Sequence, residues 1–574
     1  MKKLLRFLKG YGVETVMAPL FKLLEACFEL FIPLVVAAII DIGIAKRDNG
    51  YILGGCGIMV ALGVIGLVCA ITAQFFAAKA ATGCSAGLRK SLYSHIMRLS
   101  PSQRDVLGSS TLITRMTSDV NQIQSGINLT LRLLLRSPLI VIGSMVMAFT
   151  VDSRSALVFA AVIPLLSIVV FGIMLISIPL YKKIQARLDR VTMDTRENLN
   201  GVRVVRAFNR EAAEVNKFSE DNEQSYALQM KAGRLSALMN PLTYVIINLA
   251  IIALIYTGAL RVDSGYITQG ELYALVNYMS QILVELIKLA NLIISITKAI
   301  ACGNRVQAVF DIPEGLDTNE SDAENAENAP FISFDNVALT YKGAAAPTVQ
   351  GIDLDILRGQ TVGIIGATGS GKTTVINLLM RLYDVTEGSI KINGRDLRAH
   401  NVDALRERIA VVPQKAVLFK GTVRQNLLWG KKDASDAEMW DALRLAMADG
   451  FISEKDGGLD AEVLAHGNNF SGGQRQRLTI ARALIRRPEI LILDDSTSAL
   501  DLATDAALRK NIAALDYAPT VFIVSQRASS VRHADIILVL DDGEIVGLGS
   551  HDELIKNCPT YIEIYNSQFS DANV

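Results

Sequence analysis

The chain has 574 residues, with 57 lysines and arginines balanced by 57 aspartates and glutamates. That length excludes a single hydrophobic core and indicates several domains, and the absence of net charge excludes a general electrostatic attraction to nucleic acid. Apolar residues make up 51% and charged residues 20% of the chain, a composition typical of a protein that is partly membrane-embedded and partly globular.

The first half of the chain contains six apolar segments, whereas a bilayer-crossing helix needs about 20 predominantly apolar residues. Three segments have no charged side chain and exceed that length: residues 51–78, 155–181 and 235–260. Three others contain or adjoin charged residues: residues 30–44, 137–151 and 272–296. Soluble cores rarely hold several uninterrupted apolar runs of this length, so we expect six membrane-spanning helices.

The connections between these segments alternate between short and long. Residues 45–50, 152–154 and 261–270 are short connections, whereas residues 79–124 and 182–234 form two long loops that are rich in lysine and arginine. An excess of basic residues marks the cytoplasmic side of a membrane. We therefore expect a multi-pass protein of the cell membrane with both long loops and both termini in the cytoplasm.

The composition changes near Pro313, where residues 314–328 (EGLDTNESDAENAEN) are acidic and nearly devoid of large apolar side chains. Such a segment is typical of a linker. Beyond it, short β-branched runs at residues 331–334, 361–365 and 490–493 alternate with helical stretches, which indicates an α/β domain with a largely parallel sheet. The sequence thus predicts an all-α transmembrane domain (1–312), a linker (313–330) and an α/β domain (331–574).

Residues 366–373 (GATGSGKT) match the P-loop pattern GxxxxGK[ST] and directly follow an apolar strand. In this pattern backbone N–H groups surround the phosphates, Lys372 reaches the terminal phosphates and the Thr373 hydroxyl coordinates Mg²⁺. The pattern therefore predicts that the α/β domain is a P-loop nucleotide-binding domain with Mg²⁺ as a cofactor, and it leaves the family open. The candidate phosphate-binding residues are Gly366, Ala367, Thr368, Gly369, Ser370, Gly371, Lys372, Thr373 and Thr374.

A second motif, residues 470–474 (FSGGQ), precedes an apolar run that ends in Asp494. The sequence here resembles the ATP-binding-cassette (ABC) ATPases, whose signature is LSGGQ and whose D-loop matches residues 498–501 (SALD). The resemblance implies that Gln414 and Asp494 join Thr373 at the metal and that the ring of Tyr341 stacks on adenine. It also implies a dimer in which the signature of one subunit completes the ATP site of the other. The signature residues are Ser471, Gly472, Gly473 and Gln474.

The membrane half shares this resemblance. Residues 106–122 and 199–218 look like the two intracellular loops of ABC exporters, which carry short coupling helices that sit in grooves of the ATPase domains. The chain is therefore similar to an ABC exporter half, with a six-helix membrane domain fused to an ATPase domain. Its expected partners are a second exporter half, the lipid bilayer and a small-molecule substrate, and no nucleic acid.

Three positions depart from the family pattern. Asp495 stands where exporters have a glutamate that polarises the attacking water, Gln526 replaces the switch histidine, and Ala465 replaces a glutamate ahead of the signature. Asp495, Gln526 and Gln414 are the candidate catalytic residues. A carboxylate withdrawn by about 1 Å costs on the order of a hundredfold in rate, so we expect a site that binds ATP and cleaves it slowly.

This pattern resembles the degenerate half of heterodimeric, multidrug-type ABC exporters. Two alternatives remain open, namely a homodimer with slow turnover and an ATP-gated channel or regulator built on the same scaffold. The cargo is not identified by the sequence and belongs to the amphipathic drug-like, lipid or peptide classes that such exporters carry.

Charged residues of the last apolar segment support two interpretations. Glu285 and Lys288 are three residues apart and either neutralise one another or line a transport path. Asn277, Gln281 and Asn291 lie on the same predicted helix, which is consistent with a partly polar path.

Overall fold

The computed structural model describes residues 2–315, 329–496 and 498–569. Most of the predicted linker (313–330), namely residues 316–328, lies outside the described residues. The chain separates into two compact units, one of residues 1–97 and 110–312 and another of residues 98–109 and 313–574.

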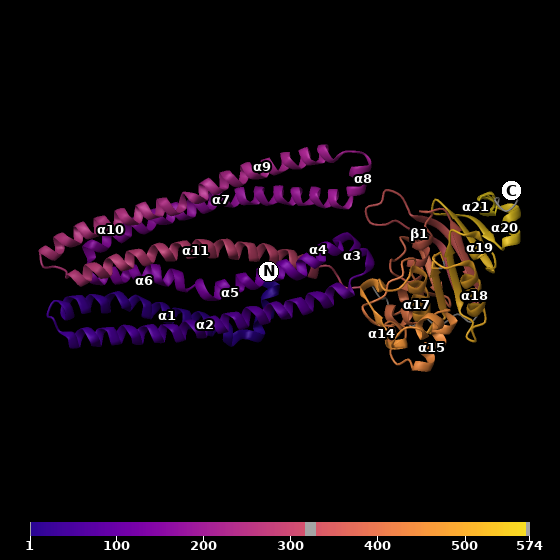
Figure 1. The fold of residues 1–574 in the computed structure, drawn as a ribbon, viewed down its shortest axis with the longest axis horizontal. Helices are drawn as coiled ribbons and strands as arrows, with labels where there is room; N and C mark the ends of the chain where they lie inside the picture. The colour runs from indigo at the N-terminus through magenta and orange to yellow at the C-terminus, as the bar shows by residue number, and fades with distance from the viewer. Residues whose placement is uncertain (1, 316–328, 497, 570–574) are drawn as a thin grey trace. The chain divides into compact units, whose positions relative to one another are not determined.

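The first unit is entirely helical (Figure 1). Among the described residues, six helical stretches are long and apolar enough to cross a membrane, as the sequence predicts. The helical elements of the unit are η1 (Lys2–Tyr11), α1 (Gly12–Ala38), η2 (Ile39–Ile44), α2 (Asn49–Arg98), α4 (Ser109–Thr114), η3 (Arg115–Asp119), α5 (Val120–Leu133), α6 (Arg136–Val151), α7 (Ser153–Asn200), α8 (Val202–Ala207), α9 (Glu211–Ala237), α10 (Met239–Asp263) and α11 (Gln269–Phe310).

The two long connections predicted as loops consist largely of helix. The 50 residues of α2 and the 48 residues of α7 continue without interruption, and each helix is about 70 to 75 Å long at 1.5 Å per residue. These lengths exceed the roughly 30 Å of bilayer hydrocarbon. The basic sequences there are rich in helix formers, so the spanning helices extend well beyond the membrane.

Helix α11 packs against α1, α5, α6, α7 and α10, and the apolar core of the unit gathers around it. Tyr278 of α11 is fully buried, and its hydroxyl donates a hydrogen bond to the backbone oxygen of Leu30 in α1 at 2.7 Å. At the end of α1 the Asp41 carboxylate accepts hydrogen bonds from the Gly270 N–H (2.8 Å) and the Thr268 hydroxyl (2.5 Å), which cap α11. The negative charge of Asp41, which lies within the first predicted span (30–44), is therefore stabilised by the N-terminus of α11.

The second unit is built on two main sheets. A four-stranded antiparallel sheet has the order β2-β1-β4-β5, and a six-stranded sheet has the order β12-β11-β3-β10-β9-β6. The strands are β1 (Ile332–Leu339), β2 (Val349–Ile356), β3 (Thr361–Gly366), β4 (Glu387–Ile392), β5 (Arg395–Asp396), β6 (Ile409–Val412), β9 (Ile490–Asp494), β10 (Thr520–Ser525), β11 (Ile536–Asp541) and β12 (Glu544–Gly549), with β7 (Gly421–Thr422) and β8 (Glu462–Val463) forming a separate pair.

The six-stranded sheet is parallel except at β12, which pairs antiparallel with β11. Strand β9 is buried along its whole length, which explains its continuous apolar sequence. The predicted parallel sheet is confirmed, whereas the antiparallel sheet that contains β1 was not predicted.

The helices of the unit are α12 (Lys372–Leu379), α13 (Val402–Glu407), α14 (Val423–Leu427), α15 (Asp436–Leu445), α16 (Asp449–Ser453), α17 (Gly472–Leu484), α18 (Leu502–Ala513), α19 (Ala528–Val531), α20 (His551–Asn557) and α21 (Pro559–Phe569), with short η4 (Leu397–Ala399), η5 (Gly458–Asp460) and η6 (Ala465–Gly467).

Helix α3 (Pro101–Leu107) also belongs to the second unit, although it lies in the first long connection. Ser100 and Gln103 form a capping box at its start, and Gly108, with φ of 75°, ends it. The Asp105 carboxylate accepts a hydrogen bond from the Tyr383 hydroxyl at 2.5 Å. The first long connection therefore contacts the rest of the second unit through α3, whose end overlaps the start of residues 106–122.

Candidate functional site

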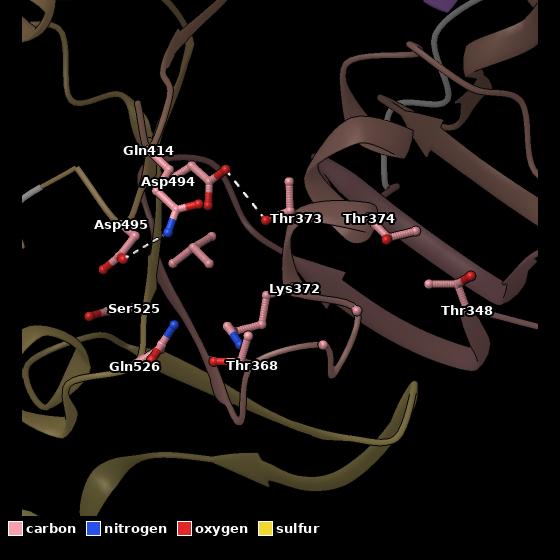
Figure 2. A pocket seen from close by; sticks show the side chains of 13 residues that line it. Thr348, Thr368, Lys372, Thr373, Thr374, Gln414, Asp494, Asp495, Ser525 and Gln526 are labelled. Atoms are coloured by element: carbon pink, nitrogen blue, oxygen red, sulfur yellow. Dashed lines mark hydrogen bonds between the residues drawn. The ribbon is translucent and has the colours of Figure 1, made fainter. Parts of the chain in front are cut away.

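A cavity of about 280 Å³ opens where several parallel strands end (Figure 2). Strands β3, β10, β9 and β6 are neighbours in the sheet, so the segments that follow them meet at one edge. Ligands bind at this edge in open α/β sheets. The lining residues are Thr348, Thr368, Gly369, Gly371, Lys372, Thr373, Thr374, Gln414, Asp494, Asp495, Val524, Ser525 and Gln526.

The P-loop follows β3 and leads into α12. Gly369 and Gly371 have φ of 89° and 93°, a backbone conformation that glycine adopts without steric cost. The Lys372 ammonium donates hydrogen bonds to the backbone oxygens of Gly366 (2.9 Å) and Ala367 (2.5 Å). Burial lowers the pKa of Lys372. The loop and its lysine thus form an amide-lined cradle at a helix start that fits a polyphosphate.

Oxygen atoms gather beside the P-loop at the end of β9. The Thr373 hydroxyl lies 3.5 Å from a carboxylate oxygen of Asp494 (Figure 2). Burial, together with the neighbouring Asp495, raises the pKa of Asp494. Two hard oxygen donors next to a phosphate cradle are the donor set that Mg²⁺ prefers.

The candidate catalytic residues line the same cavity. The Gln414 side-chain amide donates a hydrogen bond of 3.3 Å to the Asp495 carboxylate. Asp495 has φ of 43°, in the left-handed region, and its backbone oxygen accepts a hydrogen bond from the Ser498 hydroxyl at 2.9 Å. Figure 2 shows the Gln526 side chain directed toward Lys372. The fold therefore brings predicted site residues that are up to 158 positions apart, from Thr368 to Gln526, into one cavity.

Tyr341, predicted to stack on adenine, does not line this cavity. Its hydroxyl lies 3.2 Å from the Thr374 hydroxyl, at the edge of the P-loop helix. Its ring packs edge-on against Tyr383, with centroids 5.1 Å apart and an interplanar angle of 89°. Because Tyr383 also donates to Asp105, one aromatic pair connects the P-loop helix with α3.

The signature residues also lie outside the cavity. Ser471 is the N-cap of α17, where its hydroxyl accepts from the Gln474 N–H and the Gln474 side chain accepts from the Ser471 N–H. A Cβ on Gly473 would lie 3.2 Å from the backbone oxygen of Ala499 in the D-loop. The signature therefore forms a capped helix start that does not face the chain's own P-loop cavity.

Phe470 replaces the leucine of the signature without disturbing it. Its side chain is buried beside Phe451 at 6.4 Å between ring centroids, and the Lys455 ammonium lies 4.6 Å from its ring centre. The substitution is accommodated by this aromatic pocket. Sequence reasoning missed Thr348, which lies in no recognised motif, and Val524 and Ser525, which line the cavity just ahead of Gln526.

Two family profiles match the chain. The ABC transporter transmembrane region matches residues 15–286, and the ABC transporter ATPase family matches residues 349–498. An uncharacterised ABC transporter ATP-binding protein of Mycobacterium bovis is 37% identical over 573 residues, covering 99% of this chain and 98% of that protein. The chain belongs to the ABC transporter family.

Two further comparisons refine this result. A fatty acid ABC transporter ATP-binding/permease protein of Mycobacterium bovis is 33% identical over 477 residues, covering 83% of this chain and 75% of that protein. The structure of a bacterial Atm1-family ABC exporter with ATP bound matches 99% of both chains with a TM-score of 0.79 at 22% identity. This ABC exporter chain therefore combines a multi-pass membrane domain with an ATPase domain that couples ATP hydrolysis to transport, and ABC exporters work as dimers.

The membrane unit of the exporter contains a charged network that links three helices. The Arg136 guanidinium of α6 contacts Glu285 of α11 and Glu29 of α1, each at 2.7 Å. Lys288 contacts the same Glu285 at 2.7 Å, so the predicted Glu285–Lys288 pair is confirmed and forms part of a larger cluster. Glu285 and Arg136 are buried. The buried charges of Arg136 and Glu285 are stabilised because they pair with each other and with neighbouring charged side chains.

Proposed function

We propose that this chain exports an amphipathic, lipid-like substrate as one subunit of a heterodimeric ABC exporter, and that its own ATP site binds nucleotide but hydrolyses it slowly. The observation that carries the proposal is Asp495, which follows β9, lines the cavity and stands where the family resemblance places the catalytic glutamate. ATP is the fuel, and the partner half supplies the faster hydrolytic site.

The binding half of the proposal rests on the P-loop side of the cavity. Lys372 and the P-loop amides would hold the phosphates, and Thr373, Gln414 and Asp494 would hold Mg²⁺. The metal, when bound, neutralises charge that develops on the transferring phosphoryl group. None of these residues departs from the family pattern, so we expect ordinary ATP affinity.

The proposal that hydrolysis is slow rests on the length of the side chain at position 495. The Asp495 carboxylate is one methylene shorter than that of glutamate, and it accepts a hydrogen bond from Gln414. A general base acts on water only within hydrogen-bond reach, and a shift of about 1 Å costs on the order of a hundredfold in rate. Gln526 in place of histidine removes a group that can carry positive charge toward the γ-phosphate.

The substrate class is inferred from the last spanning helix. Asn277, Gln281, Lys288 and Asn291 are spaced by four, seven and three residues and therefore share one face of α11, and each is at least partly exposed. A polar face at membrane depth is costly toward lipid and suits a path for a substrate with a polar head and an apolar body. The similarity to a fatty acid ABC transporter supports the same class.

The test of the divided sites uses the full chain in lipid nanodiscs. We expect slow ATP hydrolysis by the chain alone and much faster hydrolysis when it is purified with a second exporter half that has glutamate and histidine at these positions. The double variant Asp495→Glu, Gln526→His should raise the rate of the chain alone on the order of tenfold or more. Equal turnover per dimer with and without the second half would contradict the heterodimer.

The homodimer and channel alternatives are separated by a transport assay. Inside-out vesicles containing the complex should accumulate a fluorescent fatty acid against a gradient when ATP is added, which a channel cannot do. Uptake by vesicles that contain this chain alone, at the rate of the complex, would favour the homodimer.

A further inference from the structure

The switch segment that carries Gln526 is held from behind by the C-terminal helix. Gln526 follows β10 and precedes α19, and its side chain lines the nucleotide cavity. Its backbone oxygen accepts a hydrogen bond of 2.8 Å from the side-chain amide nitrogen of Gln568, in α21. Two residues later, the Ala528 N–H donates a hydrogen bond of 2.8 Å to the side-chain oxygen of the same Gln568.

These two bonds fix the orientation of the Gln568 amide. The Gln526 carbonyl can only accept and the Ala528 N–H can only donate, so both groups are satisfied by one arrangement of the amide. The Gln568 amide therefore makes one donated and one accepted hydrogen bond with the backbone, as a neighbouring strand does in a β-sheet. A single residue therefore pins the backbone on both sides of Arg527.

Helix α21 is itself firmly placed. Tyr561 is fully buried, and its hydroxyl lies 2.8 Å from the Nδ1 atom of His551. Tyr561 belongs to the same apolar cluster as Ala528 and Val531 of α19. Helices α19 and α21 also contact each other directly. The clamp thus connects the switch segment to a packed element.

A second contact holds the far end of the segment. The Arg509 guanidinium of α18 donates hydrogen bonds to the backbone oxygens of Ser529 (2.8 Å) and Ser530 (3.1 Å). Arg509 fixes only residues beyond Ala528. Among the described residues, the side-chain hydrogen bond to the Gln526 backbone comes from Gln568.

We propose that Gln568 is a positioning residue for ATP hydrolysis, which sets the place of Gln526 over the cavity by clamping the backbone at Gln526 and Ala528. Gln568 is exposed and does not line the cavity, so it acts through the switch segment and not on the nucleotide. The step affected is the one that depends on contact with the γ-phosphate. The Gln568 hydrogen bonds involve no P-loop residue, so we expect nucleotide binding to be unaffected.

The test compares single variants of the full chain in nanodiscs. Gln568→Ala should lower kcat for ATP on the order of tenfold and leave KM within about twofold, since misplacement of a contacting group acts on rate more than on binding. Gln568→Glu keeps an acceptor for the Ala528 N–H but loses the donor to Gln526. It should therefore also lower kcat. Ser567→Ala is the matched control, because the Ser567 hydroxyl contacts only the Ile564 oxygen in its own helix among the described residues.

Amide hydrogen exchange of the peptide that covers residues 523–531 reports the clamp directly. Exchange at Ala528 should rise in Gln568→Ala, rise less in Gln568→Glu and stay unchanged in Ser567→Ala, with protection around Tyr561 retained in all three. Wild-type kcat in Gln568→Ala would overturn the proposal. Loss of protection around Tyr561 in that variant would also overturn it, because the residue would then serve only to hold α21 in place.

Discussion

Replacing Arg136 by methionine tests whether the charged network stabilises the membrane unit. The guanidinium contacts the carboxylates of Glu285 and Glu29 at 2.7 Å each, and the side chains of Arg136 and Glu285 are 9% and 3% exposed. Removing one partner of a buried ion pair costs about 3 to 5 kcal/mol, because the other charge remains buried.

The magnitude for this site follows from what Glu285 retains. After Arg136→Met, Glu285 still accepts from the Ser137 hydroxyl at 2.7 Å and contacts Lys288 at 2.7 Å. We therefore expect a loss near the lower end of that range, about 3 kcal/mol. At 1.4 kcal/mol per factor of ten this is a shift of roughly a hundredfold in the unfolding equilibrium.

The assay is unfolding of the full chain by SDS titration in mixed micelles, followed by circular dichroism. The double variant Arg136→Met, Glu285→Met removes both charges and should recover most of the loss, because apolar replacement of a buried pair is often nearly neutral. Arg132→Met is the matched control, since no ion pair of Arg132 is found among the described residues. Additive costs of the two single variants in the double variant would refute the reasoning.

Three further predictions concern the ATPase unit. MgATP affinity should fall on the acid side, because Asp494 has a raised pKa and its carboxylate is proposed to hold Mg²⁺. It should also fall on the alkaline side, because burial lowers the pKa of the Lys372 ammonium. Calorimetry across pH checks this, and Asp494→Asn should remove the acid limb. Tyr383→Phe should raise amide exchange in α3 and destabilise that contact by about 1.5 to 3 kcal/mol, since a hydrogen bond to the charged Asp105 is lost; unchanged exchange would contradict it. Ser471→Ala should cost the unit about 1 kcal/mol by removing the cap of α17, measured by thermal unfolding, with Ser471→Thr as the control; equal midpoints for alanine and wild type would exclude a capping role.

The features that could be predicted are those encoded in neighbouring residues. The P-loop, the strand that ends in Asp494 and the apolar spans each depend on a short continuous pattern, and the structure contains all of them. The parallel sheet then placed Gln414, Asp495 and Gln526 at one edge because strand ends share an edge.

The features that escaped prediction are contacts between distant segments. Arg136 and Glu285 are 149 residues apart, and the sequence offered Glu285 only its near neighbour Lys288 as a partner. Gln568 and Gln526 are 42 positions apart, and the bond between them ends on a backbone carbonyl, so no pattern of side chains in the sequence indicates it. The antiparallel sheet was missed because β1 has the same β-branched character as a parallel strand, and pairing direction is set by distant partners.

The membership of α3 in the second unit means that the chain crosses between its two halves three times, at residues 97–98, 109–110 and 312–313. Proteolysis of the acidic linker alone would leave both fragments tethered through α3. A soluble fragment beginning at residue 331 would lack Asp105 and present the Tyr383 hydroxyl to water. Activities measured on such a truncated domain would describe an ATPase that has lost its contact with α3.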